Sequence, residues 1–153
     1  MMQKIKSKQF GDWRAKTFLG QGGNGVVWLV INSAGEKAAI KILTKIEDNN
    51  KAKIYERFKN EINIVRANSD IEGLLPILDF SLPNKVVAES PWYVMPLAQS
   101  LKNLNFETSI QVILEVGKTL IALHERGVCH RDIKPANILE MDSKFYLSDF
   151  GLV

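Results

Sequence analysis

Four polar side chains near the C-terminal end of the sequence have the types and spacing that phosphoryl transfer requires. Asp132, Lys134 and Asn137 lie in one short segment, and Asp149 follows at the end of a predicted strand. Asp132 can orient or accept the proton of an attacking hydroxyl, and Lys134 can neutralise charge on the transferred group. The oxygens of Asn137 and Asp149 are hard ligands of the kind that Mg²⁺ prefers when bound phosphates complete its shell. A polar loop with a turn at Pro135 is the alternative, but it does not require these four groups together.

A glycine-rich segment, Gly20–Val27, is a candidate phosphate-binding loop. Because Gly20, Gly22 and Gly25 lack side chains, backbone N–H groups there can approach a polyphosphate. Taken alone the pattern is weak, since an ordinary glycine hairpin fits it equally well. A dinucleotide-binding fold needs a helix directly after the glycines, whereas residues 26–31 are typical of a strand, which disfavours that alternative.

Lys41 is a candidate phosphate ligand on the next predicted strand. It ends the run Ala38–Lys41, in which the apolar residues can pack on a sheet while the lysine points at phosphates. A lysine among apolar residues is more often a charge at a solvated edge. Glu61 weakens that alternative because its place on the following helix allows it to pair with Lys41, and Glu56 is a less well placed rival.

The elements that must position these groups change from strands to helices along the chain. Five β-rich runs predict strands, at residues 17–19, 26–31, 37–43, 74–80 and 92–97. The first three are separated by glycine turns, which indicates an antiparallel meander. Apolar residues at helical spacing predict a helix over residues 51–67, packed by one face on the strands. Together these elements predict a five-stranded antiparallel sheet with one helix.

A second helix is predicted over residues 108–126, just before the polar segment. Thr108 begins a capping-box pattern, and Gly127 supplies a C-terminal stop. Apolar residues cover most of the circumference of this helix, which predicts burial by neighbouring elements. Short strands are expected around 138–139 and 145–148. The predicted fold class is α+β, with a small β-rich lobe followed by the beginning of a helical lobe.

Length and composition fit one globular domain. The chain has 153 residues, of which 46% are hydrophobic, and its formal net charge of +3 is too mild to predict nucleic-acid binding. The single cysteine, Cys129, excludes an internal disulfide, and no apolar run predicts a membrane span or a secretion signal. We therefore expect a cytoplasmic protein without a membrane or nucleic-acid partner. Residues 1–12 are expected to form a solvated tail, with an anionic partner for Lys4, Lys6 and Lys8 as the alternative.

The motifs occur in the order that is typical of the eukaryotic-type protein kinases, and the sequence resembles this family, with its bacterial and phage members, over residues 13–153. The resemblance implies a protein-kinase-like fold, with a smaller lobe and hinge over residues 13–98 and the start of a larger lobe over 99–153. It also implies ATP and Mg²⁺ as cofactors and a protein as the substrate.

The resemblance implies a role for each matching residue. Nucleotide-binding residues are expected at Gly20, Gly22, Gly25, Val27, Ala39, Lys41, Glu61, Pro96, Ala98 and Leu139. Catalytic residues are expected at Asp132, Lys134 and Asn137, and magnesium ligands at Asn137 and Asp149. Lys134 is similar to the lysine usual in serine/threonine kinases, which favours that specificity.

Further positions resemble the family's hinge and internal spine. Met95 is similar to the gatekeeper that precedes the adenine-binding hinge, where Pro96 would offer only its carbonyl and Ala98 would keep its N–H donor. The hydrophobic spine would include Val65, His130 and Phe150, whose role is structural rather than chemical.

A complete kinase continues beyond the Asp149–Gly151 motif, so we expect this sequence to be a partial or prematurely ended kinase chain, with a naturally complete minimal enzyme as the alternative. Leaving about four apolar residues of the second helix uncovered would forfeit roughly 6 to 12 kcal/mol. Three functions stay open: a protein kinase, an ATP-binding or regulatory module without transfer, and a small-molecule phosphotransferase. The last is disfavoured because such enzymes usually lack the pattern seen from Lys134 to Asn137.

Overall fold

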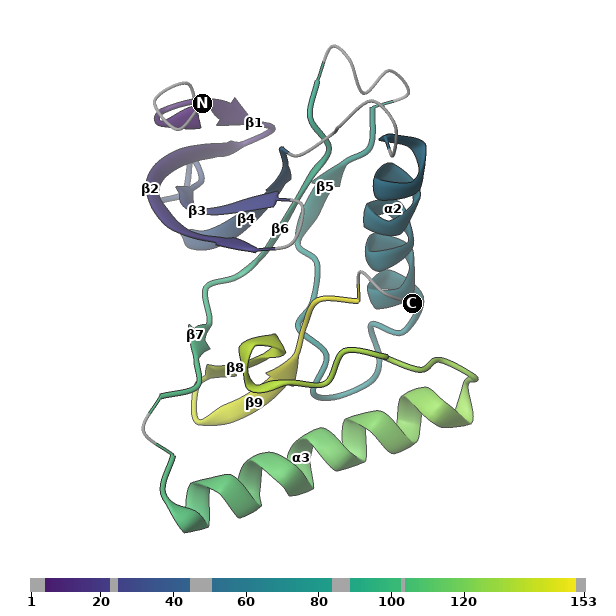
Figure 1. Cartoon of the computed structure of the whole chain (residues 1–153). Coiled ribbons are helices and arrows are strands. Elements are labelled where there is room, and N and C mark those ends of the chain that lie inside the picture. Colours follow the sequence, from purple (N-terminus) through teal and green to yellow (C-terminus); the bar gives the residue numbers. More distant parts are fainter. Residues whose placement is uncertain (1–4, 23–24, 45–50, 84–88, 103, 151–153) are drawn as a thin grey trace. The chain divides into compact units, whose positions relative to one another are not determined.

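The structure is a computed structural model that describes residues 5–22, 25–44, 51–83, 89–102 and 104–150 (Figure 1). The chain divides into two compact units. The first unit is formed by Met1–Phe58 and Ile77–Leu97, and the second by Lys59–Pro76 and Ala98–Val153. Helix α2 (Lys51–Ala67) begins in the first unit and ends in the second, with the bounds that its apolar spacing predicts.

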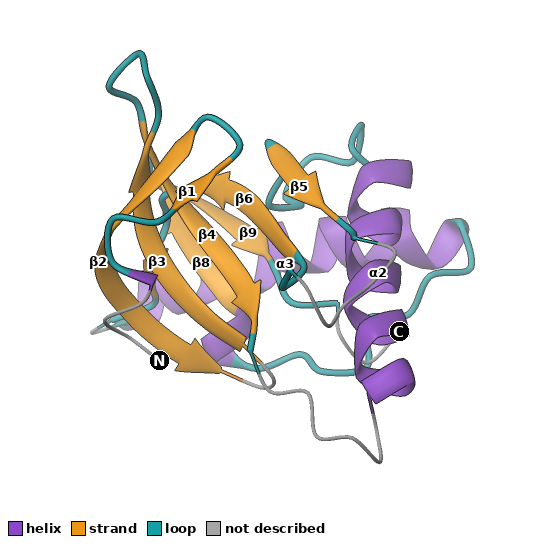
Figure 2. Cartoon of the chain, turned by 90° about the horizontal axis from the view of Figure 1, so that it is seen from above, coloured by secondary structure: helices purple, strands orange, loops and turns teal. Residues whose placement is uncertain are grey.

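The first unit contains an antiparallel sheet with the strand order β1-β2-β3-β4-β6-β5. Its strands are β1 (Gln9–Phe10), β2 (Trp13–Gly22), β3 (Gly25–Ile31), β4 (Lys37–Leu43), β5 (Asp79–Ser81) and β6 (Trp92–Pro96). Figure 2 shows β2, β3, β4 and β6 side by side, and β2 bends along its length. Register shifts between Ala15 and Thr17 and between Phe18 and Gly20 account for the bend, since such irregularities increase local twist.

One face of this sheet carries the apolar core of the first unit. Every second residue of β3 and β4 is buried there, and the N-terminal residues Ile5 and Phe10 pack against them with 8% and 4% of their surface exposed. Phe10 meets the ring of Trp92 edge to face at 5.9 Å. The predicted solvated tail is therefore wrong for residues 5–12. Burial of the two apolar side chains favours packing of this segment, and the lysines beside them stay exposed, with the Lys8 ammonium 5.1 Å above the Phe10 ring.

The sheet thus has six strands where the sequence predicts five, because β1 adds a strand at the edge. The strand predicted over residues 74–80 is also shorter than expected. Only Asp79–Ser81 pairs with β6, while Leu74 forms an isolated parallel bridge with Leu147 in the second unit. Burial of Leu74 and Leu75 in the second unit therefore replaces continuation of the strand.

The second unit combines a long helix with a small antiparallel sheet. Its elements are β7 (Gln99–Ser100), α3 (Phe106–Glu125), the 3-10 turn η2 (Pro135–Asn137), β8 (Ile138–Met141) and β9 (Lys144–Leu147). The strand order is β7-β8-β9. The turn between β8 and β9 places Asp142 and Ser143 at φ values of 52° and 59°, as a tight hairpin of this hand requires.

Asn105, rather than Thr108, caps helix α3. The Asn105 side chain accepts a hydrogen bond of 2.8 Å from the backbone N–H of Thr108, so the helix begins at Phe106. The C-terminal stop is confirmed, because Gly127 has a φ of 73° and donates its N–H to the His124 carbonyl at 2.9 Å. The predicted capping box is wrong because an asparagine three residues earlier supplies the acceptor.

Only one face of α3 is covered by described residues. Val112, Val116, Thr119 and Leu123 are buried, whereas four large apolar side chains are 59% to 80% exposed: Phe106, Ile113, Leu114 and Ile121. Burial of the whole circumference is therefore not observed within the described residues. None of the described helices has the length and apolar character needed to cross a membrane.

The second unit also contains the C-terminal half of α2 and the segment after it, which the sequence analysis groups with the smaller lobe. Hydrogen bonds within the second unit explain why this segment belongs to it. Leu147 donates to the Gly73 carbonyl at 2.7 Å and accepts from the Leu75 N–H at 3.1 Å. Arg126 binds Asp70 through both of its terminal nitrogens. These contacts attach the segment after α2 to α3 and β9.

Candidate active site

The loop between α3 and β8 brings three of the predicted catalytic side chains together. The Lys134 ammonium lies 2.7 Å from Oδ2 of Asp132, and the Asn137 amide donates to the same oxygen at 2.9 Å. Asn137 also donates to the Asp132 carbonyl at 2.8 Å. Both side-chain donors act on Oδ2, so Oδ1 of Asp132 is the oxygen that can face a hydroxyl group.

The surroundings of Asp132 favour its ionised form. The hydrogen bond from Lys134 is the largest cause that lowers the pKa of the Asp132 carboxyl, and the hydrogen bond from Asn137 is the second. Partial burial acts in the opposite direction without reversing the shift. The carboxylate is therefore in the proton-accepting form at neutral pH.

Asn137 is held in one orientation that suits a cation. Only 4% of its surface is exposed, and its backbone N–H closes the turn η2 by donating to the Lys134 carbonyl at 2.9 Å. Both side-chain hydrogen bonds to Asp132 leave from Nδ2. The amide oxygen Oδ1 takes no part in these two hydrogen bonds, and it has the hard character that magnesium prefers.

Ser148 links this cluster to Asp149, the second predicted magnesium ligand. The Ser148 backbone N–H donates to the Asn137 carbonyl at 2.9 Å, and its hydroxyl donates to the same oxygen at 3.1 Å. Asp149 has a φ of 65° and Arg131 a φ of 62°, a conformation that is uncommon for residues other than glycine. Strained backbone of this kind is concentrated at functional sites. No motif in the sequence marks Ser148 as a site residue, and its position beside Asp149 is the one feature that could have pointed to it.

His130 holds the loop through its two ring nitrogens, which contact backbone atoms rather than the side chains of Asp132, Lys134 and Asn137. The His130 ring accepts the Asp132 backbone N–H at Nδ1 over 3.3 Å, and its Nε2 lies 3.0 Å from the Ser148 carbonyl. This pattern requires the tautomer with its proton on Nε2. The ring also packs against Phe150, with 4.5 Å between centroids. Both side chains are almost fully buried, and their membership of a hydrophobic spine stays a prediction.

The donor set fits a magnesium ion that shares its shell with phosphates. Within the described ranges there is no group of three or more His, Cys, Asp and Glu side chains that could hold a metal ion by themselves. Asn137 and Asp149 would supply two protein oxygens, and Mg²⁺ commonly takes one or two carboxylates together with phosphate oxygens and water. The residues present therefore fit this ion.

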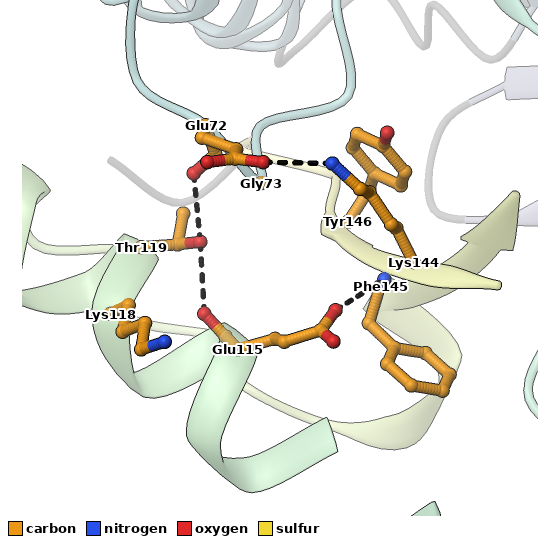
Figure 3. Close-up of a pocket in the computed structure, with 8 residues that line it drawn as sticks. All are labelled: Glu72, Gly73, Glu115, Lys118, Thr119, Lys144, Phe145 and Tyr146. Atoms are coloured by element: carbon orange, nitrogen blue, oxygen red, sulfur yellow. Dashed lines mark hydrogen bonds and ion pairs between the residues drawn. The ribbon is translucent and has the colours of Figure 1, made fainter. Parts of the chain in front are cut away.

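A separate cavity of about 230 Å³ in the second unit is not this site. Figure 3 shows its lining residues, which come from α3, the β8–β9 hairpin and the segment after α2. Its charged groups are used in local pairs: Lys144 contacts Glu72 at 2.9 Å, and Glu115 accepts the Phe145 N–H at 2.9 Å. None of the predicted catalytic residues lines it.

In the first unit, several predicted nucleotide-binding residues share one face of the sheet. Gly20, Val27, Lys41 and Tyr93 are successive cross-strand partners on β2, β3, β4 and β6. The Lys41 ammonium lies 5.6 Å from the centre of the Tyr93 ring. Ala39, two residues from Lys41, is on the same face because side chains alternate along a strand. This face is opposite the one that carries the core of the unit.

The glycines of the predicted phosphate loop differ in what a side chain at each position would meet. A Cβ atom added to Gly20 or Gly22 would meet nothing within 4 Å, so these positions leave open space above β2 and its end. A Cβ at Gly25 would lie 2.6 Å from the Ile42 carbonyl oxygen on the neighbouring strand. Gly25 is thus required by close backbone packing. Gly23 and Asn24 lie outside the described residues.

The remaining predicted nucleotide-binding residues are divided between the two units. Glu61 belongs to the second unit with 3% of its surface exposed, and its burial favours it over the exposed Glu56. Pro96 ends β6 opposite Ala38 in the first unit. The second unit contains Ala98 and also Leu139, which lies on β8 opposite Tyr146 and Ser100. The pairing of Glu61 with Lys41 and the adenine contacts stay predictions.

Comparison with known proteins identifies the family. The profile described as "Protein kinase domain" matches residues 13–153. Cysteine-rich receptor-like protein kinase 42 of Arabidopsis thaliana is 32% identical to this chain, with 90% of this chain and 22% of that protein aligned. Aurora kinase of Candida albicans is 29% identical over 92% of this chain and 28% of its own length. Serine/threonine-protein kinase PknA of Mycobacterium tuberculosis is 28% identical over 93% and 35%.

The chain therefore belongs to the protein kinase domain family, and the resemblance seen in the sequence is confirmed. It spans between 22% and 35% of the length of these three relatives. ATP and Mg²⁺ are the cofactors that membership of this family implies in general.

Proposed function

We propose that this chain carries the site of a magnesium-dependent protein kinase that transfers the γ-phosphoryl group of ATP to serine or threonine hydroxyls of protein substrates. The observation that carries the proposal is the hydrogen-bonded cluster of Asp132, Lys134 and Asn137, joined by Ser148 to Asp149. A polar loop with only a structural role has no need for a lysine and a buried amide on the same carboxylate oxygen.

Each side chain of the cluster has a task in the transfer. Oδ1 of Asp132 orients the substrate hydroxyl, whose oxygen forms a bond to the γ-phosphorus as the bond from that phosphorus to the bridging oxygen breaks and ADP leaves. The hydroxyl proton passes to the Asp132 carboxylate and then to solvent. Lys134 stabilises negative charge on the transferred group. A magnesium ion held by Asn137 and Asp149 would neutralise phosphate charge.

The face of the first unit that carries Lys41 supports a role in binding the nucleotide. Gly20, Val27 and Lys41 lie in one cross-strand row, so the lysine and the open backbone at Gly20 share a face of the sheet with one strand between them. The ammonium can bind phosphate oxygens, and the absent side chains at Gly20 and Gly22 leave room for a ligand above the backbone.

Serine/threonine specificity has two supports. Lys134, which contacts Asp132 at 2.7 Å, is similar to the lysine that the family resemblance implies for serine/threonine kinases at this position. The relatives named PknA and PknH in mycobacteria are serine/threonine-protein kinases by name, at 28% and 30% identity. We propose protein hydroxyls of this class as the substrates.

A second candidate function is an ATP-binding or regulatory module without transfer. It is favoured by the exposed apolar side chains of α3, which are typical of a surface that needs a further covering element. Such a module would bind magnesium and ATP but would leave protein hydroxyls unmodified. Transfer to a protein substrate therefore separates the two candidates.

The magnesium part of the proposal is tested by replacing Asp149 with Asn and measuring ATP affinity with and without Mg²⁺. We expect magnesium to strengthen ATP binding by the wild-type chain and this gain to fall by about tenfold or more in the variant, because a direct ligand is lost. Asp142→Asn is the matched control, since Asp142 lies in the exposed turn between β8 and β9 and also has a positive φ. Equal magnesium dependence in Asp149→Asn and the wild type would contradict the assignment.

A further inference from the structure

The segment Asn68–Leu75, which follows α2, contacts the chain at both ends of the candidate active site. Arg126, at the C-cap of α3 just before the catalytic loop, is one contact. Leu147, the last residue of β9 just before Asp149, is the other. All three parts belong to the second unit. One short segment thus joins the beginning of the loop that carries Asp132 to the strand that leads to Asp149.

At the first contact, Arg126 forms a two-point fork with Asp70. Its Nη1 donates to Oδ1 at 2.8 Å and its Nη2 to Oδ2 at 2.6 Å. The hydrogen bond from Arg126 is the main cause that lowers the pKa of Asp70 to about 2, so the pair is ionised throughout the neutral range. Parallel hydrogen bonds of this kind fix the relative orientation of the two groups as well as their distance.

The same arginine also reaches the end of α2. Nη1 of Arg126 lies 3.3 Å from Oδ1 of Asn68, whose Nδ2 donates to the Ile64 carbonyl at 2.8 Å. Only 6% of the Asn68 surface is exposed. A buried amide therefore connects the last turn of the helix that carries Glu61 with the C-cap of α3.

At the second contact, Leu147 pairs with the segment through its backbone. It donates to the Gly73 carbonyl at 2.7 Å and accepts from the Leu75 N–H at 3.1 Å, in a parallel bridge opposite Leu74. Only 1% of the Leu147 surface is exposed. The next residue, Ser148, donates its backbone N–H to the Asn137 carbonyl. A shift of the Leu147 backbone would therefore act directly on Asn137, a predicted magnesium ligand.

Between the two contacts the segment lies directly against α3 (Figure 3). The Thr119 hydroxyl is 3.1 Å from the Glu72 carbonyl and 3.2 Å from that of Glu115, and its residue is 2% exposed. Gly73 has a φ of 88°, and a Cβ atom there would lie only 2.0 Å from the Thr119 hydroxyl oxygen. The close approach leaves little freedom for the segment to slide along the helix.

The Arg126–Asp70 fork itself is in contact with solvent. The two side chains are 41% and 68% exposed, and ion pairs at such positions contribute little to global stability. Stability alone therefore gives a weak reason for a two-point fork that also binds a buried asparagine. Orientation of the loop and strand that follow is the role that the contacts support.

We infer that Arg126 is a positioning residue for phosphoryl transfer: through Asp70 and Asn68 it holds the segment after α2 in place, and this segment sets the position of Asp149 relative to Asp132. The inference rests on the proposed function for its rate effect. The physical contacts that carry it do not depend on that function.

The test compares Arg126→Met, Asp70→Ala and the double variant in the full chain. Each single variant is expected to lower kcat about tenfold or more at an unchanged KM for ATP, because a displacement of about 1 Å of reacting groups costs about 100-fold in rate. The double variant is expected to be no slower than either single variant, since both remove the same contact. Melting temperatures are expected to stay within about 4 °C of the wild type.

Lys118→Met is the matched control, because it also removes an exposed cation of α3 that acts on the segment after α2, but this cation acts on Glu72 through charge alone, without a hydrogen bond among the described residues. Its kcat is expected to equal that of the wild type. Unchanged kcat in Arg126→Met, additive losses in the double variant, or a loss of kcat that follows a large fall in melting temperature would each overturn the inference.

A second readout keeps the inference separate from the proposed function. Amide hydrogen exchange at Leu147 is expected to be faster in Arg126→Met than in the wild type and in Lys118→Met. If the wild type transfers no phosphoryl group, the proposed function fails, and the exchange rate still decides whether Arg126 controls this backbone. Equal exchange in all three proteins would overturn the positioning role.

Discussion

Two donors converge on one oxygen of Asp132, and this arrangement determines what the other oxygen can do. The ammonium of Lys134 and the amide of Asn137 both act on Oδ2, which keeps the carboxylate ionised and fixes its rotation. Oδ1 of Asp132 then stays available for the proposed substrate hydroxyl, and Oδ1 of Asn137 for the proposed magnesium ion. The hydrogen bond from Asn137 to Asp132 thus bears on both proposed roles, because it occupies one oxygen of Asp132 and uses only the amide nitrogen of Asn137.

Removal of the Lys134 charge is expected to raise the pKa of Asp132. The folded carboxyl has a lowered pKa, and the hydrogen bond from Lys134 is the largest cause, so Lys134→Met moves the pKa back towards its ordinary value. The acid titration of a ¹³C-labelled Asp132 carboxyl, followed by NMR, would therefore begin at higher pH in the variant. Lys134→Arg keeps a cation and is expected to stay close to the wild type. An identical titration in Lys134→Met and the wild type would rule out this account of Asp132.

Residue types and spacing were sufficient to predict the cluster of Asp132, Lys134 and Asn137, because all three lie in one loop and their chemistry is local. The hydrogen bonds of Ser148 and the fork of Arg126 with Asp70 could not be predicted in the same way. These contacts join residues that are distant in the sequence, and neither periodicity nor a motif marks such partners.

At the scale of elements, helix α3 has two apolar faces of similar composition that differ in burial, and therefore in their expected contribution to the free energy of unfolding. Leu123 is fully buried, whereas Leu114 on the same helix is 59% exposed. Apolar composition alone predicts burial for both leucines. The structure distinguishes them because only one face of the helix is packed against β9 and the segment after α2.

The two leucines provide a matched pair for stability. Leu123→Ala is expected to lower the free energy of unfolding by about 2 to 5 kcal/mol, because it removes buried contacts and leaves a cavity. Leu114→Ala is expected to change it by no more than about 0.5 kcal/mol, since an exposed side chain is shortened. Urea denaturation of both variants measures the difference. Equal losses would mean that the exposed face of α3 is covered in solution.

Among the elements, the sequence was most informative where a periodic pattern was long. The bounds of α2 and β4 agree with the pattern, because apolar spacing and turn residues act together there. Strand β1 was missed because a two-residue strand has no periodicity. The run that includes Leu74 was assigned to a strand, although β9 of the second unit competes successfully for its backbone.

At the scale of the whole molecule, the residues proposed for nucleotide binding and for transfer are divided between two units. The glycine hairpin and Lys41 belong to the first, and the Asp132 cluster and Asp149 to the second. Helix α2 is the continuous element that passes from one unit to the other, and its Glu61 lies in the second. Each unit thus carries one set of the proposed residues, and the proposed function draws on both sets.

The most direct test of the account is the transfer of labelled γ-phosphoryl from ATP to a serine/threonine protein substrate, with the wild type and Asp132→Asn compared at saturating ATP. We predict magnesium-dependent transfer by the wild type, and a kcat that is about 100- to 10,000-fold lower in Asp132→Asn at similar ATP affinity, because a positioned proton acceptor is lost. Transfer by Asp132→Asn at the wild-type rate would contradict the catalytic role of Asp132, and ATP binding without any transfer by the wild type would favour the nucleotide-binding module instead.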